Sequence, residues 1–162
     1  MLHIVLLEPE IPENTGNIGR TCVATGSHLH LIRPLGFDIG EKAVRRAGLD
    51  YWEHLNLSVY DDLDDFFQKH PQPDFWLAST KAPRDYTEAI FEDGCYLFFG
   101  KESKGLPEPL LAKHYERCIR IPMKEGVRSL NLANSVAVLA YEGLRQQRFP
   151  DLHSQGSLTS PT

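Results

Sequence analysis

Short apolar runs recur along this chain and alternate with longer segments whose apolar residues are spaced for a helix. The runs predict strands at residues 2–7, 29–33, 55–60, 74–79, 95–99 and 117–121. The segments between them predict helices at residues 17–26, 41–47, 61–70 and 107–114. Because strands and helices alternate through short connections, we expect an α/β fold with a mostly parallel sheet flanked by helices.

The clearest helical pattern is the last one, from residue 130 to about 147. Its apolar positions fall at three- and four-residue spacing on one face: Leu132, Val136, Leu139, Ala140 and Leu144. Ser129 stands where the N-cap of this helix would be. Asp61 is a good N-cap for the third predicted helix, and Pro107 suits the first turn of the fourth.

The size and composition of the chain are those of one globular domain. It has 162 residues, of which 41% are hydrophobic and 24% charged. From Asp151 onward the chain has too little apolar content to pack. We therefore expect a domain at residues 1–150 and a flexible tail at 151–162.

Two features favour the cytoplasm and disfavour a membrane. The apolar run at residues 2–7 stops at Glu8, too early for a signal peptide, and no apolar run approaches membrane-spanning length. The three cysteines are odd in number and scattered, with no CxxC pair: Cys22, Cys95 and Cys118. This pattern argues against a disulfide framework or a zinc site and fits a reducing compartment.

The net charge of −5 at first argues against a nucleic-acid partner, but the basic residues are clustered. They fall in three short segments: Lys42, Arg45 and Arg46; Lys101 and Lys104; Lys124 and Arg128. Much of the acid lies elsewhere, at residues 61–65. The chain can therefore present a local basic face to RNA, although a mixed solvated surface is an equally good interpretation of composition alone.

The most informative loop is the run from Phe99 to Pro107, FGKESKGLP, which follows a predicted buried strand. Gly100 and Gly105 bracket it, so its backbone can turn sharply and approach a ligand closely. Open α/β sheets bind ligands at this end of a strand. An ordinary loop, with Glu102 as a solvated or capping carboxylate, is the alternative.

Two further loops of similar character follow other predicted strands. The first holds Asn14, Gly16, Asn17 and Arg20, and it lacks the G-x-G-x-x-G fingerprint of a nicotinamide-binding fold. If a helix begins near Gly16, Arg20 can project toward the mouth of the sheet; the alternative is an ion pair with Glu8 or Glu13. The other loop covers residues 121–132. The alternative interpretation of this loop is a strand, a turn and a capped helix.

Together the three loops resemble the three motifs of the SPOUT superfamily of RNA methyltransferases. Within it the chain is most similar to the small TrmL (YibK) tRNA 2′-O-methyltransferase family. The similarity covers residues 1 to about 150 and includes the runs NTGNI, RRAGLDY and SLNL, which begin at Asn14, Arg45 and Ser129. The resemblance implies a C-terminal trefoil knot, which no pattern argument would predict. It also implies a homodimer that binds S-adenosylmethionine in the knot, largely through backbone groups.

The resemblance also implies roles for particular residues. The cofactor contacts would be Ala78, Gly100, Ile121, Ser129 and Leu130, with Ala78 at a position often filled by a larger aliphatic residue. Arg20 would assist catalysis across the dimer interface, with Asn14 and Asn131 orienting Arg20 or the ribose. Since a guanidinium stays protonated, we expect Arg20 to stabilise the developing alkoxide rather than act as a base. Glu102 would order its loop. Lys42, Arg45, Arg46 and Arg128 would bind RNA.

The implied substrate is the ribose of the wobble nucleotide, position 34, a cytidine or modified uridine of leucine tRNAs. Ribosomal RNA is an alternative substrate. A non-catalytic RNA-binding module of the same fold and a different nucleotide-using α/β enzyme are rival classes. His28 and His30 share one face of a predicted strand, which is weak as a metal pair without further ligands, so we expect a reaction without metal.

Overall fold

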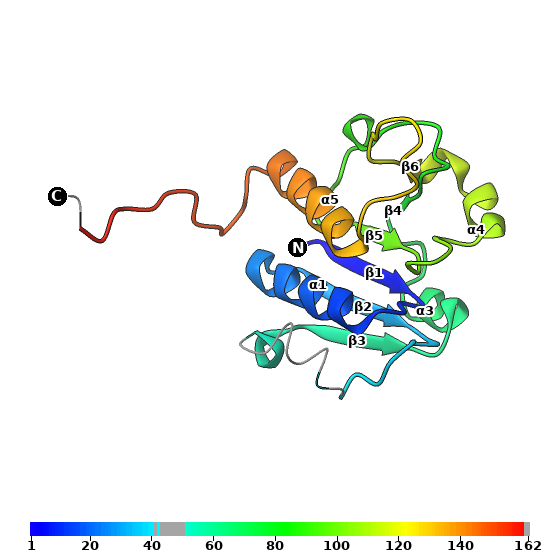
Figure 1. The fold of residues 1–162 in the computed structure, drawn as a ribbon, viewed down its shortest axis with the longest axis horizontal. Helices are drawn as coiled ribbons and strands as arrows, with labels where there is room; N and C mark the ends of the chain where they lie inside the picture. The colour runs from blue at the N-terminus through cyan, green and yellow to red at the C-terminus, as the bar shows by residue number, and fades with distance from the viewer. Residues whose placement is uncertain (41, 43–50, 161–162) are drawn as a thin grey trace.

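Six parallel strands form one sheet at the centre of the molecule (Figure 1). The computed structural model describes residues 1–40, 42 and 51–160. The described strands lie in the order β3-β2-β1-β5-β4-β6, and every neighbouring pair is parallel. Their bounds are β1 (His3–Leu7), β2 (His28–Ile32), β3 (Leu57–Tyr60), β4 (Phe75–Ala78), β5 (Tyr96–Phe99) and β6 (Cys118–Ile119).

Helices cover both faces of the sheet. The bounds of the longer described helices are α1 (Pro12–Thr25), α3 (Leu63–Lys69), α4 (Glu108–Lys113) and α5 (Leu132–Gln146). Figure 1 shows α1 and α5 side by side across the face toward the viewer, and these two helices pack on each other. Short 3-10 turns lie at Trp52–His54, Tyr86–Glu88 and Tyr115–Arg117.

Alternate residues of each strand face opposite layers. In β1, Ile4 and Leu6 pack into the cluster formed with α1 and α5, while Val5 and Leu7 pack into the cluster formed with α3 and α4. All four side chains are buried. Burial on both faces explains why the strands read as apolar runs in the sequence, as expected for a parallel sheet enclosed by helices.

The order of the strands places a topological switch point between β1 and β5. From β1 the chain builds outward through β2 to β3, then crosses to β4 and returns to pair β5 with the other side of β1. The connection after β1 therefore runs toward one edge of the sheet, and the connection after β5 runs toward the other edge. Ligands of open α/β sheets bind outside the carboxyl ends of strands at such a switch point.

The predicted parallel sheet and all six predicted strands are confirmed, and four helices match with shifted bounds. The first helix begins at Pro12 rather than near Gly16, because proline suits the first turn of a helix. The helix predicted at 41–47 lies outside the described residues, apart from Lys42.

Two predicted N-caps are wrong by one or two residues. Asp62, not Asp61, caps α3 by accepting a hydrogen bond from the backbone N–H of Asp65 at 2.7 Å. Asn131, not Ser129, caps α5 by accepting from the N–H of Asn134 at 3.1 Å. In both cases the side chain that caps is the one three residues before the N–H it accepts from.

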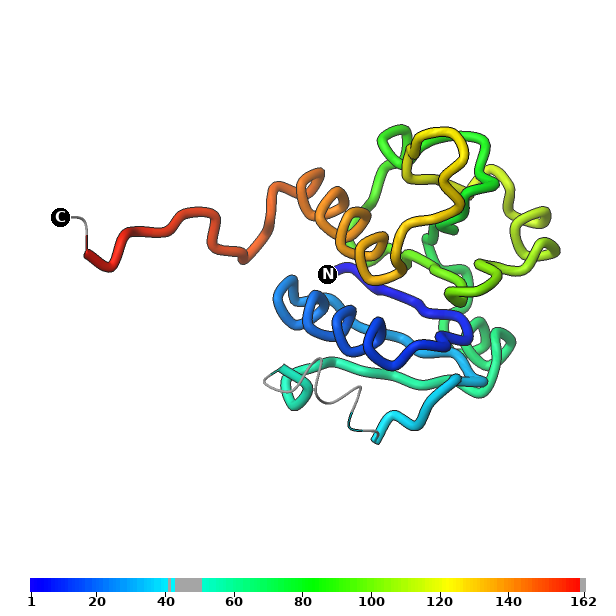
Figure 2. Tube along the Cα trace, in the orientation of Figure 1, coloured from blue at the N-terminus to red at the C-terminus, as the bar shows by residue number. Residues whose placement is uncertain are grey.

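After α5 the chain leaves the body of the domain. Figures 1 and 2 show this segment running away from the helices, and its described residues from His153 to Ser160 form no helix or strand and are exposed. Among the helices described, none has the length and apolar character needed to span a bilayer.

Candidate functional site

A cavity of about 640 Å³ opens at the carboxyl edge of the sheet. Its walls are formed by residues at and after the ends of β4, β5 and β6, by the start of α5, and by Ile11 and Asn14 after β1. All five residues predicted as cofactor contacts line it: Ala78, Gly100, Ile121, Ser129 and Leu130. The structure therefore brings together residues from segments that are well separated in the sequence.

The loop after β5 turns so tightly that only glycine fits at its start. A Cβ atom built on Gly100 would lie 2.0 Å from the carbonyl carbon of Gly105 and 2.2 Å from the backbone nitrogen of Leu106. Gly105 has a φ of +70° and donates its N–H to the carbonyl of Lys101 at 2.9 Å. The two glycines thus fold the loop back on itself at the wall of the cavity.

Two glutamates join the loop after β5 to the loop after β1. The carboxylate of Glu102 accepts from the backbone N–H groups of Glu10 and Ile11 at 2.8 and 3.0 Å, and from Asn14 Nδ2 at 3.3 Å. The carboxylate of Glu10 accepts from the N–H and hydroxyl of Ser103 at 2.9 and 2.7 Å. The hydrogen bond from the Ser103 side chain, followed by that from its backbone, lowers the pKa of Glu10. No motif in the sequence pointed to Glu10.

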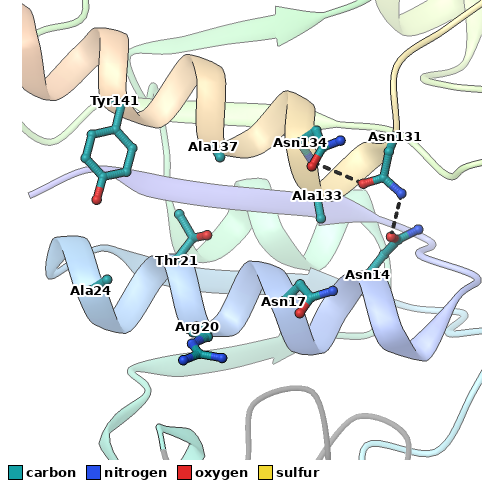
Figure 3. A pocket seen from close by; sticks show the side chains of 10 residues that line it. All are labelled: Asn14, Asn17, Arg20, Thr21, Ala24, Asn131, Ala133, Asn134, Ala137 and Tyr141. Carbon is teal, nitrogen blue, oxygen red and sulfur yellow. Dashed lines mark hydrogen bonds between the residues drawn. The ribbon is translucent and has the colours of Figure 1, made fainter.

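The hydrogen bonds of Glu10 and Glu102 that join the two loops form an interlock. Asn14 and Asn131 connect this interlock to α5. Asn131 Nδ2 donates to Asn14 Oδ1 at 3.1 Å, while Asn131 Oδ1 caps α5 (Figure 3). Asn14 is buried and donates in turn to Glu102. Both amides line the cavity and also a neighbouring groove. Their described partners are thus each other, Glu102 and Asn134, and not Arg20.

The groove lies between α1 and α5 and has a volume of about 590 Å³ (Figure 3). Its lining includes Arg20, which is exposed and lies outside the lining of the cavity. The guanidinium carbon of Arg20 lies 4.6 Å from the ring centroid of Tyr51, and its NH2 group donates to the Tyr51 hydroxyl at 3.3 Å. The described partner of Arg20 is therefore Tyr51, not Glu8 or Glu13.

The predicted RNA-binding residues are placed only in part. Arg128 lines the cavity and donates to the carbonyl of Ser103 at 3.4 Å, so it ties the third loop to the second. Lys101 lies 3.9 Å from a carboxylate oxygen of Glu8, and Lys104 and Lys42 are exposed. Arg45 and Arg46 lie outside the described residues.

Known proteins match this chain over nearly its whole length. The sequence profile of the SpoU rRNA Methylase family matches residues 1–141. A protein of Geobacillus stearothermophilus named putative tRNA (cytidine(34)-2′-O)-methyltransferase is 54% identical over 154 residues, which cover 93% of this chain and 98% of that protein.

Solved structures agree with this relationship. One, reported as structural insights into the 2-OH methylation of C/U34 on tRNA, is 48% identical, has a TM-score of 0.88 and covers 91% of this chain and 97% of its own. The SpoU methyltransferase AviRb from Streptomyces viridochromogenes, in complex with the cofactor AdoMet, is 22% identical with a TM-score of 0.80 over 91% of this chain and 61% of its own, and shows a shared fold. The resemblance seen in the three loops is confirmed, and this chain belongs to the SpoU rRNA methylase family.

Proposed function

We propose that this protein transfers a methyl group from S-adenosylmethionine to the ribose 2′-OH of nucleotide 34, a cytidine or modified uridine, in leucine tRNAs. The observation that carries the proposal is the convergence of Ala78, Gly100, Ile121, Ser129 and Leu130 on one cavity. The 54% identical relative is named for methylation of cytidine 34 in tRNA, and that likeness extends over almost the whole of both chains.

The cavity fits the proposed cofactor in size and chemistry. Its volume of about 640 Å³ lies within the range of small-molecule sites, roughly 300–1,000 Å³. Ile121, Leu130 and Leu132 offer apolar surface for an adenine ring, and Ser129 and the Gly100 loop offer polar groups. Ala78 can contribute through its backbone despite its small side chain. When bound, S-adenosylmethionine supplies an electrophilic methyl group.

Arg20 supplies the charge that the reaction needs on the acceptor side. As the ribose hydroxyl attacks, negative charge develops on its oxygen, and a fixed guanidinium stabilises that charge. The proton passes to phosphate, water or a transiently neutral arginine, because a guanidinium is almost always protonated. Asn14 and Asn131 line both the cavity and the groove, so we assign them to orienting the ribose.

We further propose that the active site is shared between the subunits of a homodimer. Arg20 lines the groove between α1 and α5, not the cavity of its own subunit. Val138 and Tyr141 of α5 expose 37% and 47% of their surface, which gives a second copy apolar surface to cover. In such a dimer, Arg20 would face the cofactor of the partner subunit.

The C-terminal trefoil knot implied by the family resemblance is part of this proposal. In its support, the chain reaches the edge of the sheet at β6 and then returns past the Gly100 loop to α5, which packs against β5 and α1. Lys42, Arg45, Arg46 and Arg128 are assigned to tRNA binding. We place the protein in the cytoplasm, where its proposed substrate is found.

The test is methyl transfer to bulk tRNA with labelled S-adenosylmethionine, followed by nucleoside mapping. We expect label on the ribose of nucleotide 34 in leucine tRNAs. Methylation of ribosomal RNA instead would favour the alternative substrate, which is the one in the name of the SpoU rRNA Methylase family. Calorimetry that detects no S-adenosylmethionine binding at millimolar concentration would contradict the enzyme and favour an RNA-binding module.

A further inference from the structure

Three histidines gather on the face of the sheet opposite α1 and α5. His3 begins β1, His28 begins β2 directly beside it, and His30 lies two residues further along β2. One ring nitrogen from each can be chosen so that all three lie within 4.8 Å of one another. His30 is fully buried, while His3 and His28 are partly exposed at the rim. The sequence indicated the pair His28 and His30; the register between β1 and β2 adds the third.

Neighbouring hydroxyl groups form hydrogen bonds with one ring nitrogen of His28 and one of His30. His28 Nε2 lies 2.8 Å from Ser58 Oγ, and His30 Nδ1 lies 2.7 Å from the hydroxyl of Tyr60. These hydrogen bonds leave His28 Nδ1 for a ligand. His30 Nε2 and His3 Nδ1 share a hydrogen bond of 2.9 Å, so a bound ion would take the place of the proton between these two nitrogens. A hydrogen bond to the second ring nitrogen is the usual support of a metal-binding histidine.

We propose that His3, His28 and His30 bind one divalent ion of the zinc type, with water as the fourth ligand. Three imidazoles and a water form a known tetrahedral zinc site. Zinc–nitrogen bonds of about 2.0–2.1 Å place the three nitrogens about 3.3 Å apart. His3 Nδ1 and His30 Nε2, which lie 2.9 Å apart, must therefore separate slightly to hold an ion. His28 stacks on His30 with centroids 4.0 Å apart and must turn out of this stack, which its place at the rim allows.

This site is separate from the proposed cofactor cavity. His3 and His28 are the first residues of their strands, whereas the cavity lies beyond the carboxyl ends of β4, β5 and β6. A bound ion would cross-link β1 to β2 at the amino end of the sheet. Since it would bind the folded chain and not the unfolded one, it would raise the free energy of unfolding by an amount that grows with the logarithm of the free ion concentration above its Kd.

The test uses the full-length protein stripped with a chelator and then titrated with ZnCl₂ in a calorimeter. We expect one ion per chain, a higher Tm with zinc, and the visible absorption of tetrahedral cobalt when CoCl₂ replaces zinc. His3→Ala and His28→Ala should each weaken zinc binding by at least about tenfold, and Ser58→Ala by about 10–100-fold. His153→Ala, an exposed histidine outside the cluster, is the matched control and should bind normally.

Several outcomes would overturn the site. These are binding of less than one ion per wild-type chain, equal affinity in wild type and His28→Ala, or loss of binding in His153→Ala. Circular dichroism of each variant verifies its fold, and His28→Ala at the rim decides the question if His3→Ala unfolds. S-adenosylmethionine affinity should be the same with and without zinc, so this test stands or fails independently of the proposed function.

Discussion

Glu10 and Glu102 hold each other's loops. The Glu102 carboxylate accepts the backbone N–H of Glu10 at 2.8 Å, and the Glu10 carboxylate accepts the N–H of Ser103, the residue after Glu102, at 2.9 Å. The two acids lie 92 residues apart in the chain. They make the loops after β1 and β5 into one unit at the point where the strand order reverses. Asn14 of the first loop and Gly100 of the second both line the cavity, so its shape depends on this exchange.

We predict that Glu102→Gln weakens S-adenosylmethionine binding by about tenfold. The amide offers one acceptor oxygen in place of a charged carboxylate that accepts from three donors, and hydrogen bonds to charged groups are the stronger kind. Calorimetry measures the Kd, and the Tm from thermal melts should be nearly unchanged. Glu116→Gln removes an exposed carboxylate that is not part of the cavity lining and is the control. Equal affinity in both variants would show that the interlock does not shape the cavity.

Gly100→Ala should abolish cofactor binding and lower the Tm. The added Cβ would meet backbone atoms of Gly105 and Leu106, which cannot move aside as a flexible side chain can. Overpacking of this kind costs about 1–3 kcal/mol of the free energy of unfolding, and here it would also open the turn. Gly156→Ala, where an added Cβ meets nothing within 4 Å, should leave both quantities unchanged. Normal binding by Gly100→Ala would place the cofactor elsewhere.

The fold could be predicted from sequence where burial dictates the pattern. Strands buried on both faces read as apolar runs, and the apolar face of α5 has helical spacing, so these elements were found. The helix starts could not be fixed. Ser129 and Asn131 are both good caps before the same apolar face, and only the backbone path decides that Asn131 caps while Ser129 lines the cavity.

The candidate site, like the fold, could be predicted from the sequence only in part. The residues lining the cavity were predicted through the family resemblance of their loops. The contacts between loops were not, because they depend on which strands are neighbours. The exchange between Glu10 and Glu102 requires β1 beside β5, and the addition of His3 to the histidine pair requires β1 beside β2 in register. Nothing in the local sequence carries this information.

The predicted basic surface implies how tRNA binding depends on salt concentration. Arg45→Gln with Arg46→Gln should weaken tRNA binding and reduce the slope of log K against log salt by up to about 2, because fewer counterions are released. S-adenosylmethionine affinity should not change. Lys113→Gln with Arg148→Gln removes the same charge from exposed positions outside the cavity and groove linings. If both double variants keep the wild-type slope, the arginines form an ordinary solvated surface.

Arg20→Ala should lose most methyl transfer while it still folds, dimerises and binds S-adenosylmethionine. Removal of one well-placed charge-stabilising group costs a factor of roughly 10²–10³ in rate. Arg20→Lys should restore little, because an ammonium lacks the planar fork that stacks on the Tyr51 ring and reaches its hydroxyl. Single-turnover rates with saturating cofactor measure the effect. Near-normal rates in Arg20→Ala would refute the catalytic role.

The same variant tests whether the site is shared between subunits. Leu130 lines the cavity and is 38% exposed, so Leu130→Trp should block the cofactor without disturbing the core. Each variant alone should be inactive. If Arg20 of one subunit serves the cavity of the other, a heterodimer of the two variants contains one intact site, formed by Arg20 of the Leu130→Trp chain and the cavity of the Arg20→Ala chain. We therefore expect up to about half of wild-type activity per verified heterodimer. No recovery would confine Arg20 to the cavity of its own subunit, and the groove between α1 and α5 would then need another explanation.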